Sequence, residues 1–162
     1  MQTIATQNPR AGSRRRWKTA TVIVLGITLL AGACMPLMML MHGKVERPAP
    51  QEFGLGPRAS YGGTFRATIE PAEPLRKRKL MSVRLRVEDA AGQAIDGATI
   101  AVDGGMPQHG HGLPTQPRVT RAVADGVYEV QGVRFNMGGW WELKFRVTTA
   151  AGTDSVTFNI EL

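Results

Sequence analysis

The chain of 162 residues has a single cysteine, Cys34, so it cannot form an internal disulfide. Aromatic residues make up only 6% of the sequence. Beyond residue 60, no stretch shows the apolar repeat of about 3.6 residues that marks an amphipathic helix. These absences exclude a disulfide-stabilised fold and a helical bundle, and they leave a core built from strands.

The motifs of common enzyme classes are also missing. No serine stands in a nucleophile motif, no pair of carboxylates accompanies the histidines, and no glycine-rich loop opens a helix that would cradle phosphate. The one cysteine falls within an apolar segment. The sequence therefore predicts a protein that is not an enzyme.

Positive charge is concentrated at the start of the chain. The net charge of +7 divides into +6 for residues 1–60, with eight basic residues against two acids, and +1 for residues 61–162, with twelve against eleven. A nucleic-acid-binding domain would carry the basic excess on its folded part. The basic residues Arg14, Arg15, Arg16 and Lys18 instead suit a cytoplasmic flank attracted to anionic lipid, and no nucleic-acid partner is expected.

One long apolar run is present. Residues 20–41 form a stretch of 22 residues without a charge, about the length that crosses the hydrocarbon core of a bilayer as a helix. By the positive-inside rule, the basic residues before it place the N-terminus in the cytoplasm. We expect a cytoplasmic tail over residues 1–19, a single transmembrane anchor in a bacterial inner membrane over residues 20–42, and a periplasmic C-terminal domain.

Two kinds of processing compete with a retained anchor. Residues 30–34, Leu-Ala-Gly-Ala-Cys, resemble a degraded lipoprotein cleavage box, which would lead to lipidation of Cys34. Residues 13–18, Ser-Arg-Arg-Arg-Trp-Lys, resemble a twin-arginine export signal, which would lead to cleavage. The sequence leaves all three alternatives open, and each of them places the following domain outside the cytoplasm.

The segment after the anchor changes character twice. Residues 43–60 contain three prolines and three glycines without an apolar period, which predicts an extended linker. After residue 60 the period becomes two, as expected for half-buried strands. Apolar residues alternate with polar ones in two long runs: Met81, Val83, Leu85 and Val87, then Trp141, Leu143, Phe145 and Val147.

Turn signals such as Asp96-Gly97 and Asp125-Gly126 divide this region into short segments. Seven strands in about 100 residues predict an all-β fold, an immunoglobulin-like antiparallel β-sandwich over residues 61–162. We expect the strands near residues 63–70, 79–89, 97–103, 117–124, 126–132, 139–149 and 153–161.

Soft metal ligands cluster in the connection between the third and fourth expected strands. His109 and His111 are one glycine apart, so their side chains share a face on an extended segment. Met106 lies just upstream, and Met137 lies in the connection between the fifth and sixth strands. If both connections occupy one end of the sandwich, imidazole and thioether ligands would meet there, and this set favours copper over zinc or a hard cation. The structural alternative is a solvated turn for the histidines and core packing for Met137.

Two adjacent tryptophans follow Met137. Trp140 and Trp141 point to opposite faces of the same expected strand. One of them is expected in the core. The other either covers the histidine cluster or forms an interaction surface for a partner.

These motifs together resemble a known family. The segments at residues 106–112 (Met-Pro-Gln-His-Gly-His-Gly), 126–128 (Gly-Val-Tyr) and 135–141 (Phe-Asn-Met-Gly-Gly-Trp-Trp) are similar to those of YtkA-like and FixH-like domains, and the resemblance spans residues 61–162. It implies an immunoglobulin-like fold in a membrane-associated protein outside the cytoplasm. For FixH-like proteins it also implies a role in assembling the copper-containing cbb3-type cytochrome oxidase. The histidine and methionine positions resemble the ligands of periplasmic copper chaperones, with different spacing.

Two functions follow as alternatives. In the first, a membrane-anchored periplasmic module binds copper through the four histidine and methionine residues, and assists copper delivery or the assembly of a membrane complex such as a copper-containing respiratory oxidase. In the second, the domain binds no metal and docks on a membrane complex through Trp140 or Trp141.

Overall fold

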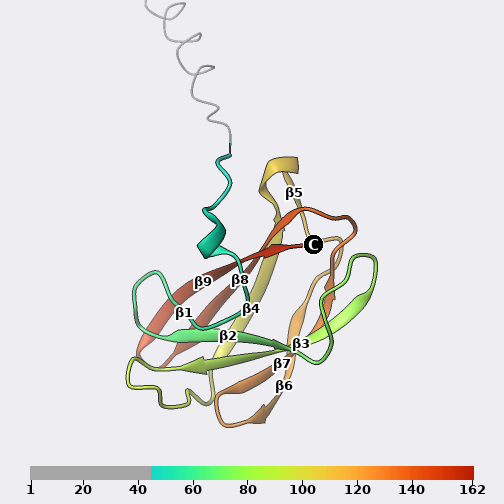
Figure 1. Cartoon of the computed structure of the whole chain (residues 1–162). Coiled ribbons are helices and arrows are strands. Elements are labelled where there is room, and N and C mark those ends of the chain that lie inside the picture. The colour runs from blue at the N-terminus through green and yellow to red at the C-terminus, as the bar shows by residue number, and fades with distance from the viewer. Residues whose placement is uncertain (1–44) are drawn as a thin grey trace, which may run out of the picture. The chain divides into compact units, whose positions relative to one another are not determined.

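Residues 45–162, which the computed structural model describes, fold into two antiparallel sheets that pack face to face (Figure 1). One sheet has the strand order β1-β2-β3-β7-β6 and the other the order β5-β4-β8-β9. The strands are β1 (Arg58–Ala59), β2 (Arg66–Pro71), β3 (Leu80–Glu88), β4 (Thr99–Met106), β5 (His111–Gly112), β6 (Arg118–Ala124), β7 (Val127–Arg134), β8 (Trp140–Thr149) and β9 (Gly152–Glu161).

The helical segments of residues 45–162 are two short 3-10 turns, η1 (Pro50–Glu52) and η2 (Pro107–His109). Neither could cross a bilayer, and no other helix occurs in this part of the chain. The expected cytoplasmic tail over residues 1–19 and the expected anchor over residues 20–42, with Cys34, lie outside the described residues.

All seven expected strands are present, and their ends lie within three residues of the expected positions. The prediction of an all-β fold made of two packed antiparallel sheets is confirmed. The alternation that predicted the strands is visible in their burial, because every second residue of β3 from Met81 to Val87 is buried. Two additional strands, β1 and β5, have two residues each and carry no sequence period.

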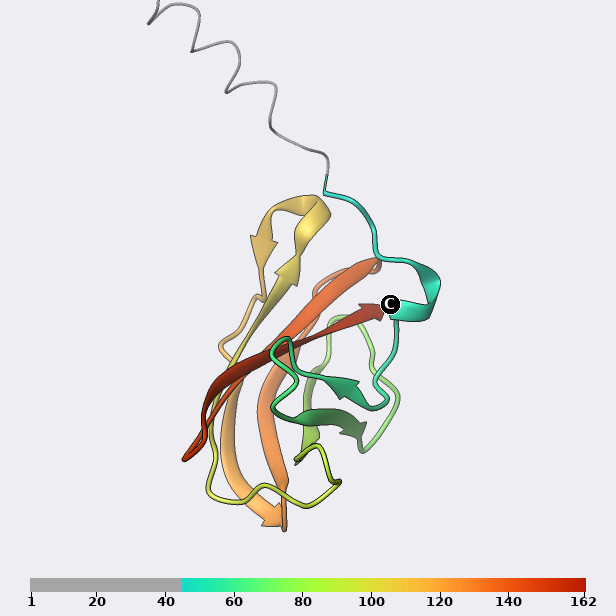
Figure 2. The ribbon, with the colours of Figure 1, turned by 90° about the vertical axis from the view of Figure 1, so that its left-hand side faces the viewer.

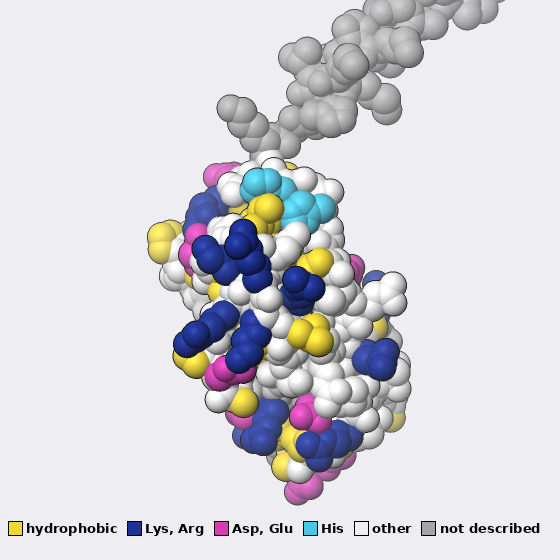
Figure 3. All heavy atoms as spheres, turned by 90° about the vertical axis from the view of Figure 1, so that its right-hand side faces the viewer, with side chains coloured by type: hydrophobic (Ala, Val, Ile, Leu, Met, Phe, Trp, Pro, Cys, Tyr) yellow, Lys and Arg dark blue, Asp and Glu magenta, His cyan; other side chains and the backbone are white. Residues whose placement is uncertain are grey.

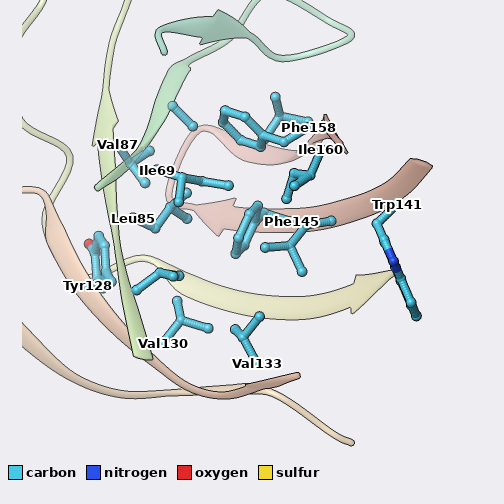
Figure 4. Close-up of a cluster of buried hydrophobic side chains, with 14 of the residues drawn as sticks. Ile69, Leu85, Val87, Tyr128, Val130, Val133, Trp141, Phe145, Phe158 and Ile160 are labelled. Atoms are coloured by element: carbon cyan, nitrogen blue, oxygen red, sulfur yellow. The ribbon is translucent and has the colours of Figure 1, made fainter. Parts of the chain in front are cut away.

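The core lies between the two sheets and takes side chains from both (Figure 4). Leu85 and Val130 enter from the first sheet, and Phe145 and Phe158 enter from the second with their rings edge to face at 5.9 Å. Each such fully buried side chain stabilises the fold by about 1.5–3 kcal/mol. Trp141 lies at one end of the buried cluster, where it borders the candidate site.

Most of the segment expected to be a linker, residues 43–60, falls within the compact unit, which begins at Val45. We call residues 45–62 the strap. Its strand β1 pairs with β2, and its backbone also bonds β9, from Gly54 N–H to Asn159 O at 2.9 Å and from Tyr61 N–H to Ser155 O at 2.9 Å. The strap therefore covers edges of both sheets. Prolines and glycines prevent a long strand there, but they permit these isolated bonds.

Candidate metal site

The candidate histidines lie on a narrow hairpin that projects beyond one end of the sandwich (Figures 1 and 2). Strands β4 and β5 form its two sides, with Met106 opposite His111 and Gly105 opposite Gly112. The turn η2 connects the strands and ends at Gly110, whose N–H donates to Met106 O at 3.0 Å. The hairpin thus holds both histidines on a short backbone-bonded frame.

Gly105 allows the two sides of the hairpin to approach closely. A Cβ atom at this position would lie 2.4 Å from the carbonyl oxygen of His111, closer than any side chain can be placed against backbone. Gly104 has the same role on the other side of β4, where a Cβ atom would lie 2.3 Å from Glu142 O. The glycines before Met106 therefore have a packing function in the hairpin.

His109 and His111 are exposed, and their ring centroids lie 5.9 Å apart with an interplanar angle of 42°. Two imidazoles bound to one ion through bonds of about 2.0 Å have ring centres roughly 5–6 Å apart. The distance between the two rings therefore allows both imidazoles to bind the same metal ion.

The ring of His111 is oriented by a backbone contact. Its Nδ1 atom lies 3.0 Å from the carbonyl oxygen of Gly112. A carbonyl oxygen only accepts hydrogen bonds, so Nδ1 carries the proton, and in the neutral ring the lone pair is then on Nε2. A bond of this kind is typical of metal-binding histidines, because it fixes the tautomer and directs the other nitrogen outward.

Trp141 connects the hairpin to the β7–β8 loop. Its indole packs edge to face against the His111 ring at 5.6 Å and against Phe135 at 5.3 Å. Its Nε1–H donates to the backbone oxygen of Met137 at 3.1 Å. The two connections that carry the predicted ligands thus meet at one end of the sandwich.

The two methionines occupy different environments. Met106 shares the inner face of the hairpin with His111, is only 1% exposed, and lies so close to Gly139 that a Cβ atom there would be 3.0 Å from Met106 Cε. Met137 is 39% exposed. Met106 is therefore a core residue beneath the histidines. Met137 is at the surface, so the alternative of core packing is wrong for it.

Neither tryptophan offers the interaction surface predicted from the sequence, because Trp140 is 2% and Trp141 0% exposed. Trp141 covers the base of the histidine cluster, as one alternative expected. Trp140 is on the other face of β8, where the strap residue Phe53 packs edge to face on it at 6.5 Å. Its Nε1–H donates to Asn159 Oδ1 at 3.0 Å. Sequence reasoning missed this cover because Phe53 stands alone in a segment without a strand period.

A groove of about 220 Å³ lies beside the hairpin, and it is lined by His111 and by residues of β4 and β8. Glu142 in this groove pairs with Lys144 at 2.8 Å and raises the pKa of that lysine, so the two charges largely compensate each other. Within residues 45–162, no three histidine, cysteine or acidic side chains come together in a way that would hold a metal. A metal on this hairpin would therefore need thioether or external ligands besides the two imidazoles.

A family model described as YtkA-like matches residues 63–146, just over half of the chain. The chain belongs to the YtkA-like family. This confirms the resemblance predicted from the sequence motifs. All four candidate ligands of this YtkA-like protein lie inside the matched range, as does Trp141.

Comparison with curated proteins gives no match. Among solved structures, the YtkA-like protein is similar to the crystal structure of the Lin-41 filamin domain, with 15% identity, 65% of this chain and 97% of that chain covered, and a TM-score of 0.39. It is also similar to the ZirS C-terminal domain, with 11% identity, 100% of this chain and 88% of that chain covered, and a TM-score of 0.37.

Proposed function

We propose that this YtkA-like protein binds copper on the β4–β5 hairpin and passes it to another protein. His109 and His111 are the primary ligands, and Met106 and Met137 are the candidate thioether ligands. The observation that carries the proposal is the pair of exposed imidazoles 5.9 Å apart, one of them with its Nδ1 atom held by a backbone carbonyl.

Copper suits these residues better than other biological metals. Imidazole and thioether are soft or borderline ligands that favour copper, whereas zinc sites commonly include thiolate, carboxylate or a third histidine. Within residues 45–162, no third histidine, cysteine or acidic side chain joins the two imidazoles in a group that could hold a metal, which fits the same choice. Two exposed ligands leave coordination positions open, which suits an ion that is passed on.

The place of action is part of the proposal. The uncharged run over residues 20–41 and the basic residues before it support a single-pass protein of the bacterial inner membrane with this domain in the periplasm. The receiving partner would then be a membrane protein complex, such as a copper-containing respiratory oxidase. Contact with the lipid bilayer is assigned to residues 20–42.

The direct test is a Cu(I) competition titration against a chromophoric chelator. We expect one copper ion per chain, and we expect binding to be lost in the His109→Ala/His111→Ala double variant. Gln108→Ala is the matched control, because Gln108 is exposed in the same turn and should leave affinity unchanged. Met106→Leu and Met137→Leu remove one thioether each at similar volume, so each affinity loss would identify a sulfur ligand.

A second measurement locates the ion. Cu²⁺ quenches indole fluorescence at short range, and Trp141 is the indole that contacts His111. We expect Trp141→Phe to remove most of the quenching and Trp140→Phe to preserve it. If neither quenching nor competition shows binding, the protein is better described by the metal-free alternative. The projecting hairpin would then be its docking surface in place of the buried tryptophans.

A further inference from the structure

The end of the domain that carries the hairpin also carries uncompensated positive charge. Arg76, Lys77 and Arg78 lie in the loop before β3, and Arg134 ends β7. All four are exposed, and we call them the basic rim. Figure 3 shows Lys and Arg side chains gathered directly below the histidines on this face.

A short chain of contacts links the basic rim to the candidate site. The backbone of Lys77 forms an isolated parallel β-bridge with Phe135, and the Arg78 N–H donates to the Phe135 carbonyl oxygen. Phe135 packs against Trp141 at 5.3 Å, and Trp141 packs against His111 at 5.6 Å. Two aromatic rings therefore separate the rim from the nearer histidine.

The basic rim concentrates positive charge in one region of a domain that has almost no net charge. Residues 45–162 contain 14 basic and 13 acidic residues, a net charge of +1. Two neighbouring basic residues are paired, Lys79 with Glu73 at 2.6 Å and Arg86 with Glu70 at 2.7 Å. The rim residues have no ion pair with any acid of the described domain.

Apolar side chains are exposed within the same region. Leu80 is 64% exposed and lies opposite Arg134 across the β3–β7 pair, and Met137 is 39% exposed in the next loop. Protein interfaces commonly combine an apolar centre with a polar or charged rim. The region has both components beside the two imidazoles.

We propose that the copper-exchanging partner of this protein docks on the basic rim through an acidic protein surface. The inference rests on the proposed function and specifies its partner. A positive rim repels free copper ions and attracts an acidic protein, so the ion moves between ligands inside a complex. Steering by opposite charges raises association rates by about 10- to 1,000-fold at low ionic strength.

The test uses two synthetic donor peptides loaded with Cu(I). Both carry the same methionine and histidine ligands, one flanked by glutamates and the other by glutamines. Transfer to the full chain in neutral detergent is followed by stopped flow. We expect at least about tenfold faster transfer from the acidic donor at low salt, and no advantage at about 1 M salt, where the Debye length is about 3 Å.

Charge-matched variants locate the effect. Lys77→Gln/Arg134→Gln should remove the advantage of the acidic donor. Arg66→Gln/Arg146→Gln changes the charge equally at exposed positions outside the rim and should keep the advantage. Copper affinity in the competition titration should be the same in both variants, because neither changes a candidate ligand.

The outcomes separate the partner from the copper site. Equal rates from both donors, with copper binding intact, would overturn the docking proposal alone. It would also be overturned if the rim variant left transfer unchanged but reduced binding of residues 45–162 to phosphatidylglycerol vesicles, since the rim would then be a lipid contact. If the protein binds no copper, salt-sensitive binding of the copper-free acidic peptide would support docking, and absence of such binding would reject it.

Discussion

Gly105 is the residue on which the hairpin geometry depends most directly. Because a Cβ atom there would meet the His111 carbonyl oxygen at 2.4 Å, Gly105→Ala must move backbone. We expect the substitution to lower the free energy of unfolding by about 1–3 kcal/mol, measured by urea denaturation. Gly112→Ala is the control, since its Cβ atom would meet only Gly104 O at 3.5 Å. Equal losses in the two variants would contradict the steric argument.

The attachment of the strap should depend on pH through the carboxyl group of Asp154. Its carboxylate accepts hydrogen bonds from Gly62 N–H at 3.0 Å and from the Thr64 hydroxyl at 2.9 Å. The Ser60 hydroxyl has the largest effect on the carboxyl group, and the N–H of Ser155 and these two donors add to it. Together they hold the pKa of Asp154 well below its ordinary value of 3.8.

A carboxyl group whose pKa is lower in the folded state contributes stability above its unfolded pKa, and that stability is lost as the pH falls toward the folded value. We expect the free energy of unfolding to decrease as the pH drops below about 4. In Asp154→Asn the decrease should be smaller. Urea denaturation of both proteins across this range is the measurement, and parallel pH curves would show that Asp154 has no such role.

For individual residues, the sequence predicted which residue types would lie close together, but it did not predict which side chains would be buried. The single glycine between His109 and His111 was sufficient to place both on the hairpin. Core packing was the alternative expected for Met137 from its phase with Val133 and Phe135, but Met137 is exposed and Met106 is buried. Met106 is buried because its side chain packs into the core beside Gly139, and its pairing with His111 depends on how many residues the turn uses. No local pattern encodes this number.

Among the elements, the strap makes the most testable contribution to stability. Phe53 covers Trp140, and the Arg47 guanidinium lies 4.8 Å from the centre of the Phe53 ring. We expect Phe53→Ala to cost about 1–2 kcal/mol in thermal or urea unfolding, below the roughly 3–5 kcal/mol of a fully buried phenylalanine, because the ring is only half-buried. The fluorescence of Trp140 should also shift toward that of a solvated indole.

Val45→Ala serves as the control within the strap, because Val45 is 51% exposed and its loss should change stability by less than about 0.5 kcal/mol. A negligible effect of Phe53→Ala would mean that the strap is not part of the cooperative unit. The extended linker expected from the sequence would then be the better description of the protein in solution.

The contrast between the strap and the long strands shows what periodicity can predict. Strands β3 and β8 have one wet face and one dry face, so their sequences alternate and their positions could be predicted. The strap contacts the sandwich through two strand residues, single backbone bonds and one aromatic ring. Such contacts leave no repeat in the sequence, and the prolines of this segment are equally typical of an extended linker.

Across the whole molecule, the protection of backbone amides against hydrogen exchange should depend on the position of each strand in its sheet. In the two sheets of residues 45–162, β3 and β8 have a partner strand on both sides, whereas β6 is an edge strand. We expect amide hydrogen exchange to be slowest in β3 and β8 and faster in β6 and the hairpin turn. Exchange in β6 as slow as in β3 would indicate that another chain covers this edge.

The pairing of Met106 with His111 also limits how this protein can vary. Side chains alternate across a strand with a period of two, so adding or deleting one residue in the turn would send the His111 ring to the opposite face of β5. The imidazole would then lose Trp141 and its partner histidine together. Related proteins that use the same pair of ligands should therefore tolerate substitutions at Gln108, but they should keep the length of the turn.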